Sequence, residues 1–203
     1  MNLRTLWWEL GLLLVALGAG AGLSACAPAG AFTPLIPASL SSDDREAGFA
    51  GVSNIDARDI SSPEETAFNG QFWYDMRIAE ETDAGFIVFA GQTSFVGAGG
   101  RLRKTVMRSG RFALALEGQG GITWVAGAVP MSMRLTDGIY LYSAPSAGAR
   151  RYSPIQIPVG LALATSNDYS FMIESGVGLD PGFFEEERLT VFPTLGLALA
   201  WKF

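Results

Sequence analysis

Seven charged residues in the middle of the chain could act on one another, because they fall on shared faces of segments that have the pattern of β-strands. They are Asp75, Arg77, Arg101, Arg103, Glu117, Arg134 and Glu174. Alternate positions of a strand point to the same side of a sheet. Both signs are present, and burying a charge without a partner is costly. We therefore expect these side chains to form ion pairs in the interior of the fold.

Histidine is absent from the sequence. This absence excludes Ser-His-Asp and Cys-His catalytic sites, and it excludes metal sites built on His ligands. No other pairing of a nucleophile with a base is readable. We predict a protein without enzyme activity, cofactor or bound metal. A lipid-modifying or proteolytic reaction that uses Ser or Glu remains an open alternative.

Two further charged clusters lie between predicted strands. Three glutamates at residues 185–187 could bind a divalent cation, since carboxylates suit Ca²⁺ and Mg²⁺. Arg150 and Arg151 could meet lipid phosphates or a polyanion. The simpler interpretation of both clusters is a solvated surface loop, and any surface ligand stays unidentified.

Cys26 is the only cysteine, and it follows an apolar N-terminal segment. Arg4, the apolar residues 10–21 and the small residues before Cys26 are typical of a secretory signal peptide. The sequence Leu-Ser-Ala-Cys that ends at Cys26 resembles the lipobox of bacterial lipoproteins. That resemblance implies that the lipoprotein-processing machinery removes residues 1–25 and lipidates Cys26. An ordinary signal peptide and an uncleaved anchor are the alternatives.

The last segment of the chain alternates between large apolar residues and small or polar ones. The apolar set is Leu189, Val191, Pro193, Leu195, Leu197, Leu199, Trp201 and Phe203. A period of two predicts a β-strand. A strand that ends at the last residue, with aromatic residues at Trp201 and Phe203, resembles the closing strand of bacterial outer-membrane β-barrels. In that family the barrel-assembly machinery reads this pattern as its signal.

Alternation of the same kind predicts nine earlier strands. They cover residues 48–58, 68–78, 84–93, 96–107, 111–123, 126–136, 138–145, 155–164 and 169–179. We predict an all-β fold, a single antiparallel up-and-down transmembrane β-barrel of ten strands. Eight strands are the alternative, if the weak first strand is absent and another pair merges.

The connections indicate how such a barrel would be oriented. Short links with turn residues mostly alternate with longer or less regular ones, and outer-membrane barrels place short turns in the periplasm. Both termini would then be periplasmic. Residues 26–46, rich in Pro, Ala and Ser, would form a tether between the lipid and a barrel of residues 47–203.

Composition agrees with a barrel in a membrane. Charged residues make up 17% of the chain, compared with about 25% in a typical soluble domain. A net charge of −6 and the lack of a basic stripe exclude a nucleic-acid binder. On the last strands the face opposite the bulky residues holds mostly Gly and Ala, which suits a narrow lumen more than a water-exposed surface.

These observations predict a lipid-anchored barrel in the bacterial outer membrane, with a structural or surface-interaction role and a lumen filled by side chains. Its partners would be outer-membrane lipid and the two machineries for processing and assembly. A narrow channel for small solutes is one alternative. A soluble periplasmic β-barrel lipoprotein that binds an apolar ligand is another.

Overall fold

The computed structural model describes residues 45–54, 67–91, 95–121, 124–149, 155–165, 169–180 and 190–203. The predicted signal peptide, Cys26, Arg150, Arg151 and the glutamates at 185–187 lie outside these ranges. The strands are β1 (Arg45–Asn54), β2 (Ala67–Ala79), β3 (Thr82–Gly91), β4 (Phe95–Ser109), β5 (Phe112–Gly120), β6 (Val125–Ala128), β7 (Met131–Thr136), β8 (Ile139–Ser143), β9 (Ser146–Ala149), β10 (Ile155–Ala164), β11 (Tyr169–Asp180) and β12 (Thr190–Lys202). None of the described residues forms a helix long and apolar enough to cross a membrane.

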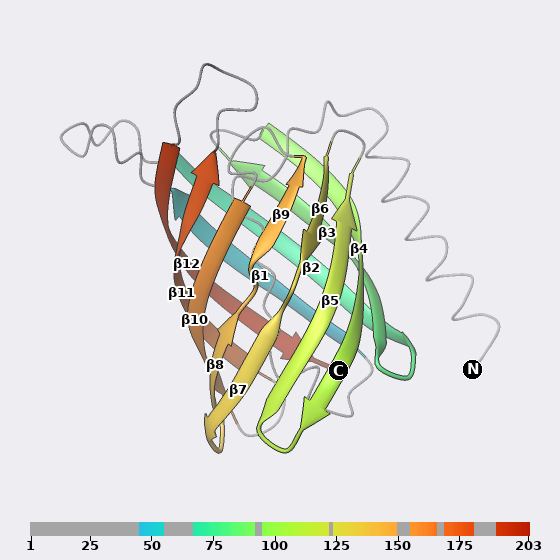
Figure 1. Cartoon of the computed structure of the whole chain (residues 1–203). Helices are drawn as coiled ribbons and strands as arrows, with labels where there is room; N and C mark the ends of the chain where they lie inside the picture. The colour runs from blue at the N-terminus through green and yellow to red at the C-terminus, as the bar shows by residue number, and fades with distance from the viewer. Residues whose placement is uncertain are drawn as a thin grey trace.

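The strands form a single sheet that closes on itself as a barrel (Figure 1). Each strand pairs antiparallel with its neighbours, and β12 returns to pair with β1. The short strands β6 and β7 both pair with β5, and β8 and β9 both pair with β10. β6 and β7 together take the place of one barrel strand, and β8 and β9 together take the place of another. The predicted all-β antiparallel barrel of ten strands is therefore confirmed.

The barrel closes earlier in the sequence than predicted. β1 begins at Arg45, and its residue Glu46 pairs in register with Lys202 of β12. Both Arg45 and Glu46 were predicted to belong to the tether. They belong to the barrel because the last strand extends to Lys202 and supplies them with a hydrogen-bonding partner.

One proline divides the sixth predicted strand, and another lies at the end of the seventh. Pro130 separates β6 from β7, and Pro145 separates β8 from β9. Proline has no N–H to donate to a ladder, but the carbonyls still accept hydrogen bonds at 2.8 Å, Pro130 from Ala115 and Pro145 from Val129. The seventh strand therefore continues as β9 over Ser146–Ala149, where the sequence predicted a connection.

The two ends of the barrel differ. One end, here called the turn end, carries the short turns after β2, β4, β7 and β10 and also both ends of the described barrel chain. Glu81 (φ 59°) and Gly138 (φ 79°) adopt the left-handed conformation that such tight turns require. The opposite end, the loop end, is where β1, β3, β5, β9 and β11 finish.

The two faces of the wall differ as the alternation predicted. Leu197 is 50% exposed on the outside of β12, whereas its neighbour Ala198 is 4% exposed on the inside. The same contrast runs along β10 and β11, where apolar side chains point outward and small or polar ones point inward. Most of the charged residues of the wall therefore face the lumen.

Candidate functional site

Four charged residues lie side by side in a row on the inner wall, one on each of the strands β2, β3, β4 and β5. Arg77 of β2 pairs in register with Asp83 of β3, Asp83 with Arg103 of β4, and Arg103 with Glu117 of β5. Their charges alternate in sign across the four strands. Side chains directly opposite in an antiparallel pair lie about 4.5–5.5 Å apart at Cβ, so each charge has an opposite charge beside it.

A second row lies next to the first, toward the loop end. It runs from Lys202 of β12 through Glu46, Asp75, Gly85 and Arg101 to Gln119 of β5. The two rows together are called the lumen network. Each row carries as many positive as negative charges, so the lumen network as a whole is neutral.

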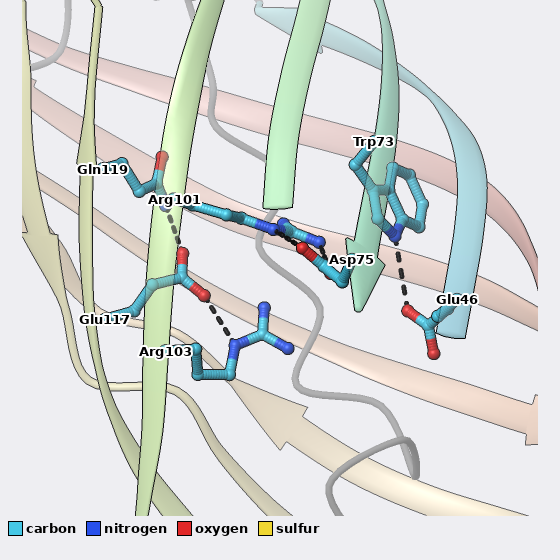
Figure 2. Close-up of polar contacts among 7 residues, drawn as sticks. All are labelled: Glu46, Trp73, Asp75, Arg101, Arg103, Glu117 and Gln119. Atoms are coloured by element: carbon cyan, nitrogen blue, oxygen red, sulfur yellow. Dashed lines mark hydrogen bonds and ion pairs between the residues drawn. The ribbon is translucent and has the colours of Figure 1, made fainter. Parts of the chain in front are cut away.

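The central contacts of the lumen network are two Arg–carboxylate pairs (Figure 2). Arg101 binds Asp75 with two nitrogens, Nε to Oδ1 at 2.5 Å and Nη2 to Oδ2. Arg103 donates from Nε to Oε2 of Glu117 at 2.6 Å, and Gln119 donates to the other oxygen of Glu117 at 2.5 Å. Hydrogen bonds between charged groups of this kind are stronger than neutral ones.

Trp73 connects the lumen network to β1. Its indole Nε1 donates to Oε1 of Glu46 at 3.3 Å (Figure 2). Its ring lies across Gly48 of the neighbouring strand. Any side chain at Gly48 would collide with that ring. Trp73 is fully buried and lies beside Ala50, Val52 and other apolar residues of the core. An aromatic residue that covers a glycine in this way fixes strand pairing.

The interior is packed at this level of the barrel. The side chains of Arg103 and Glu117 are 3% and 0% exposed, and Trp73 is 0% exposed. Side chains on the wall of a wide, water-filled pore would be accessible to solvent. The lumen network therefore fills the space it lines.

Gly85 makes the Arg101–Asp75 pair possible, because it occupies the β3 position between the two side chains. A Cβ at Gly85 would collide with the Asp75 carboxylate and with the backbone carbonyl of Tyr74. Only glycine leaves the arginine room to reach across a whole strand.

Gly85→Ala should destabilise the barrel by about 1–3 kcal/mol, the usual cost of inserting a group into a packed interior. Gly118→Ala is the matched control, since Gly118 lies on the outside of β5 and a Cβ there meets nothing within 4 Å. Urea unfolding of the two variants in lipid vesicles measures the difference. Equal unfolding midpoints would show that Gly85 does not have this role.

Four of the seven charged residues that the sequence singled out form the two central pairs, Arg101 with Asp75 and Arg103 with Glu117. Arg77 also lies in the first row, and its Nε is 3.3 Å from Asp83. The sequence predicted Asp83 in a turn and Glu46 in the tether. Extending the alternation of Gly48, Ala50 and Val52 back by one step would have placed Glu46 on the inner face.

Two of the seven predictions need correction. Arg134 lies near the turn end with its side chain 42% exposed, and its nearest carboxylate is that of Asp137 in the adjacent turn, at 3.9 Å. It is on the lumen face of β7, but it lies too near the rim to reach the buried acids. Glu174 is buried, yet no cation among the described residues forms an ion pair with it.

Glu174 instead belongs to a third row, on the wall formed by β7, β8, β10 and β11. Ser132, Tyr142, Gly160 and Glu174 are register partners in that order. The phenol of Tyr142 lies over Gly160, on the side of the wall where Glu174 stands. Where Asp75 has an arginine across Gly85, Glu174 has the Tyr142 phenol across Gly160.

The two buried glutamates should respond differently to the same change. Glu117→Gln removes the partner charge of Arg103 and should destabilise the barrel by about 3–5 kcal/mol. Glu174→Gln removes a buried charge that has no cation, so stability should stay the same or rise. Thermal loss of the folded form in SDS gels measures both variants. A large loss of stability in Glu174→Gln would mean that its charge is compensated by a group outside the described residues.

The contacts of the lumen network are suited to a structural role more than to catalysis. The carboxylates of Asp75 and Glu117 are engaged by arginines, and Glu46 accepts from Trp73. In the described part of the chain, no group of three or more Cys, Asp or Glu side chains is placed to hold a metal ion. The lumen network can hold the wall together and close the interior.

Comparisons with known proteins find similar shapes but no similar sequences. No protein-family model matches the chain, and no curated protein matches its sequence. Among solved structures, a KdgM porin in complex with disordered oligogalacturonate is similar over 78% of this chain and 99% of its own, with 9% identity and a TM-score of 0.47. Ail, the attachment invasion locus protein of Yersinia pestis, is similar over 79% and 97%, with 9% identity and a TM-score of 0.36. Similarity at this level says nothing about what this barrel binds.

Proposed function

We propose that this chain is an outer-membrane β-barrel with a structural or surface-interaction role and a lumen filled by side chains. Lipidated Cys26 would anchor it, and the tether would join that lipid to β1. The single observation that carries the proposal is the difference between the two faces of the barrel wall. Large apolar side chains are exposed outside, while charged ones are buried inside.

The outer face favours lipid over water as its surroundings. Exposed apolar side chains follow one another along β10, β11 and β12, as at Leu161, Ile173 and Leu197. Soluble proteins rarely expose a continuous apolar surface of more than a few hundred Å². The lumen also contains apolar side chains, such as Ile87, Phe89 and Met172, but a soluble barrel would cover them with a polar outer face. The outer-membrane interpretation therefore accounts for the surface better.

Aromatic rings near the turn end support a membrane boundary there. Phe49 contacts Trp201 at 5.5 Å between ring centroids, and Tyr74 contacts Phe203 at 6.2 Å. These contacts cover the seam where β1 meets β12. Outer-membrane barrels carry such aromatic girdles at both membrane interfaces. Trp201 and Phe203 would also serve as the assembly signal.

The packed lumen network favours a closed barrel over a channel. Two experiments test the proposal. Folded outer-membrane barrels resist SDS until boiled, so the mature protein should migrate differently on gels before and after heating. In planar bilayers it should give no stepwise conductance, whereas steady single-channel currents would establish the channel alternative. A protein that stays in the soluble periplasmic fraction would overturn the outer-membrane location.

The anchor has its own test. Cys26→Ser should abolish palmitate labelling and leave the unprocessed precursor, because lipobox processing acts on the thiol. Labelling with radioactive palmitate and gel mobility of the precursor measure both effects. Unchanged palmitate incorporation in this variant would disprove lipidation at Cys26, although the barrel itself would stand.

A further inference from the structure

Two charged residues lie on the outer face of the described strands, Arg45 at the turn-end start of β1 and Lys104 within β4. Of the outward-facing positions in the described strands β2 to β12, Lys104 of β4 alone carries a charge. Leu102 and Val106 on its own strand and Leu116 directly opposite on β5 are apolar and about half exposed, and its register partner on β3 is Thr82. No carboxylate among the described residues forms an ion pair with Lys104.

If the proposed function is correct, this surface faces lipid, and Lys104 must find its counter-charge there. A charge on the lipid face costs about 2–4 kcal/mol at the bilayer midplane but only about 0–1 kcal/mol near the interface. Lys104 lies in the turn-end half of β4, five positions before Ser109 at the end of that strand. Its long side chain can lie along the apolar surface and place the ammonium at the level of the headgroups.

A second cation lies farther toward the turn end on the same hairpin. Arg111 is exposed in the turn between β4 and β5, and no ion pair involves it among the described residues. Its backbone carbonyl accepts a hydrogen bond from the N–H of Arg134 at 2.7 Å. Arg108, which lies between Lys104 and Arg111 in the sequence, is already bound to Glu81 at 3.2 Å. The hairpin therefore presents two uncompensated positive charges beside an apolar surface.

We propose that Lys104 and Arg111 bind the headgroup of an anionic phospholipid in the leaflet at the turn end. Lys104 would contact the phosphate, Arg111 would add attraction from the water side, and the acyl chains would lie on Leu102 and Leu116. Charge complementarity identifies the occupant, since two cations without acidic partners favour a lipid with a net negative charge over a zwitterionic one.

The test uses the full mature protein, folded into nanodiscs with equal amounts of phosphatidylglycerol and phosphatidylcholine. Native mass spectrometry then counts the lipids that stay bound after release. The wild type should retain phosphatidylglycerol in preference to phosphatidylcholine. Lys104→Met and Arg111→Gln should each reduce that preference by roughly five-fold, from the typical attraction of one surface Lys or Arg to an anionic membrane. Methionine suits a lipid-facing position, so Lys104→Met is expected to fold.

The matched control removes two cations from the other end of the barrel. Arg150→Gln with Arg151→Gln changes residues that follow the loop-end finish of β9 in the sequence, and should leave the preference unchanged. An equal preference in wild type and Lys104→Met, or no preference in the wild type, would overturn the proposal. The heat-modifiable fraction is measured in the same samples. A protein that never folds in lipid would refute the proposed function, whereas a folded barrel without lipid preference would refute this inference alone.

Discussion

Arg103→Ala should lower the free energy of unfolding of the barrel by about 3–5 kcal/mol, the usual result of removing one partner from a buried ion pair. Arg103 donates to Glu117 at 2.6 Å, and both side chains are almost completely buried. Among the described residues, the substitution leaves the interior Glu117 carboxylate with the amide of Gln119 as its one hydrogen-bond donor. Urea unfolding in vesicles, followed by tryptophan fluorescence, measures the effect.

Arg134→Ala is the matched control for this prediction. Arg134 is also a lumen-facing arginine, but its side chain is 42% exposed and its contact with Asp137 is 3.9 Å long. Exposed pairs of this kind contribute about 0–1 kcal/mol. If both variants unfold at the same urea concentration, the lumen network does not stabilise the barrel.

Leu197→Arg should cost about 2–4 kcal/mol and strongly reduce the amount of folded protein in the outer membrane. Leu197 points outward from the middle of β12, with Ile173 as its register partner on β11. Outside the barrel an arginine here would meet hydrocarbon. Leu197→Met is the control, because methionine keeps an apolar side chain at the same outward position. Its yield should equal that of the wild type. A normal yield of Leu197→Arg would mean that this face meets water.

The faces of the strands were predictable because one face of each strand is lined by large apolar residues. Leu195, Leu197 and Leu199 alternate with Gly196 and Ala198, and a period of two assigns them to opposite faces. The same alternation predicts that Arg101, Arg103 and Glu117 lie inside the barrel. Alternation depends on local sequence only, so it needs no knowledge of which strands are neighbours.

Pairing between charges was harder to predict, because it depends on the register between strands. Asp75 reaches Arg101 across β3 only because Gly85 is their common register partner. The register places Tyr142 and Gly160 beside Glu174 and supplies no cation there. Alternation alone cannot distinguish these two carboxylates, since both lie on the inner face of a strand.

The ends of the strands were also hard to predict from the sequence. Glu46 follows a segment rich in Pro, Ala and Ser, and only its pairing with Lys202 at the far end of the chain makes it part of β1. The seventh predicted strand ended at Pro145, which has no N–H to donate to a ladder. Continued pairing of β9 with β6 and β10 extends the wall beyond it.

The central claim is that the outer face of this barrel contacts lipid. A spin label at Leu197→Cys in a Cys26→Ser background tests it most directly, with the purified barrel folded in vesicles. Power-saturation electron paramagnetic resonance compares the collisions of the label with oxygen, which concentrates in hydrocarbon, and with a water-soluble nickel chelate. The account predicts frequent collisions with oxygen and few with the chelate. A label at Leu197 that collides freely with the chelate would contradict it and would favour a soluble barrel.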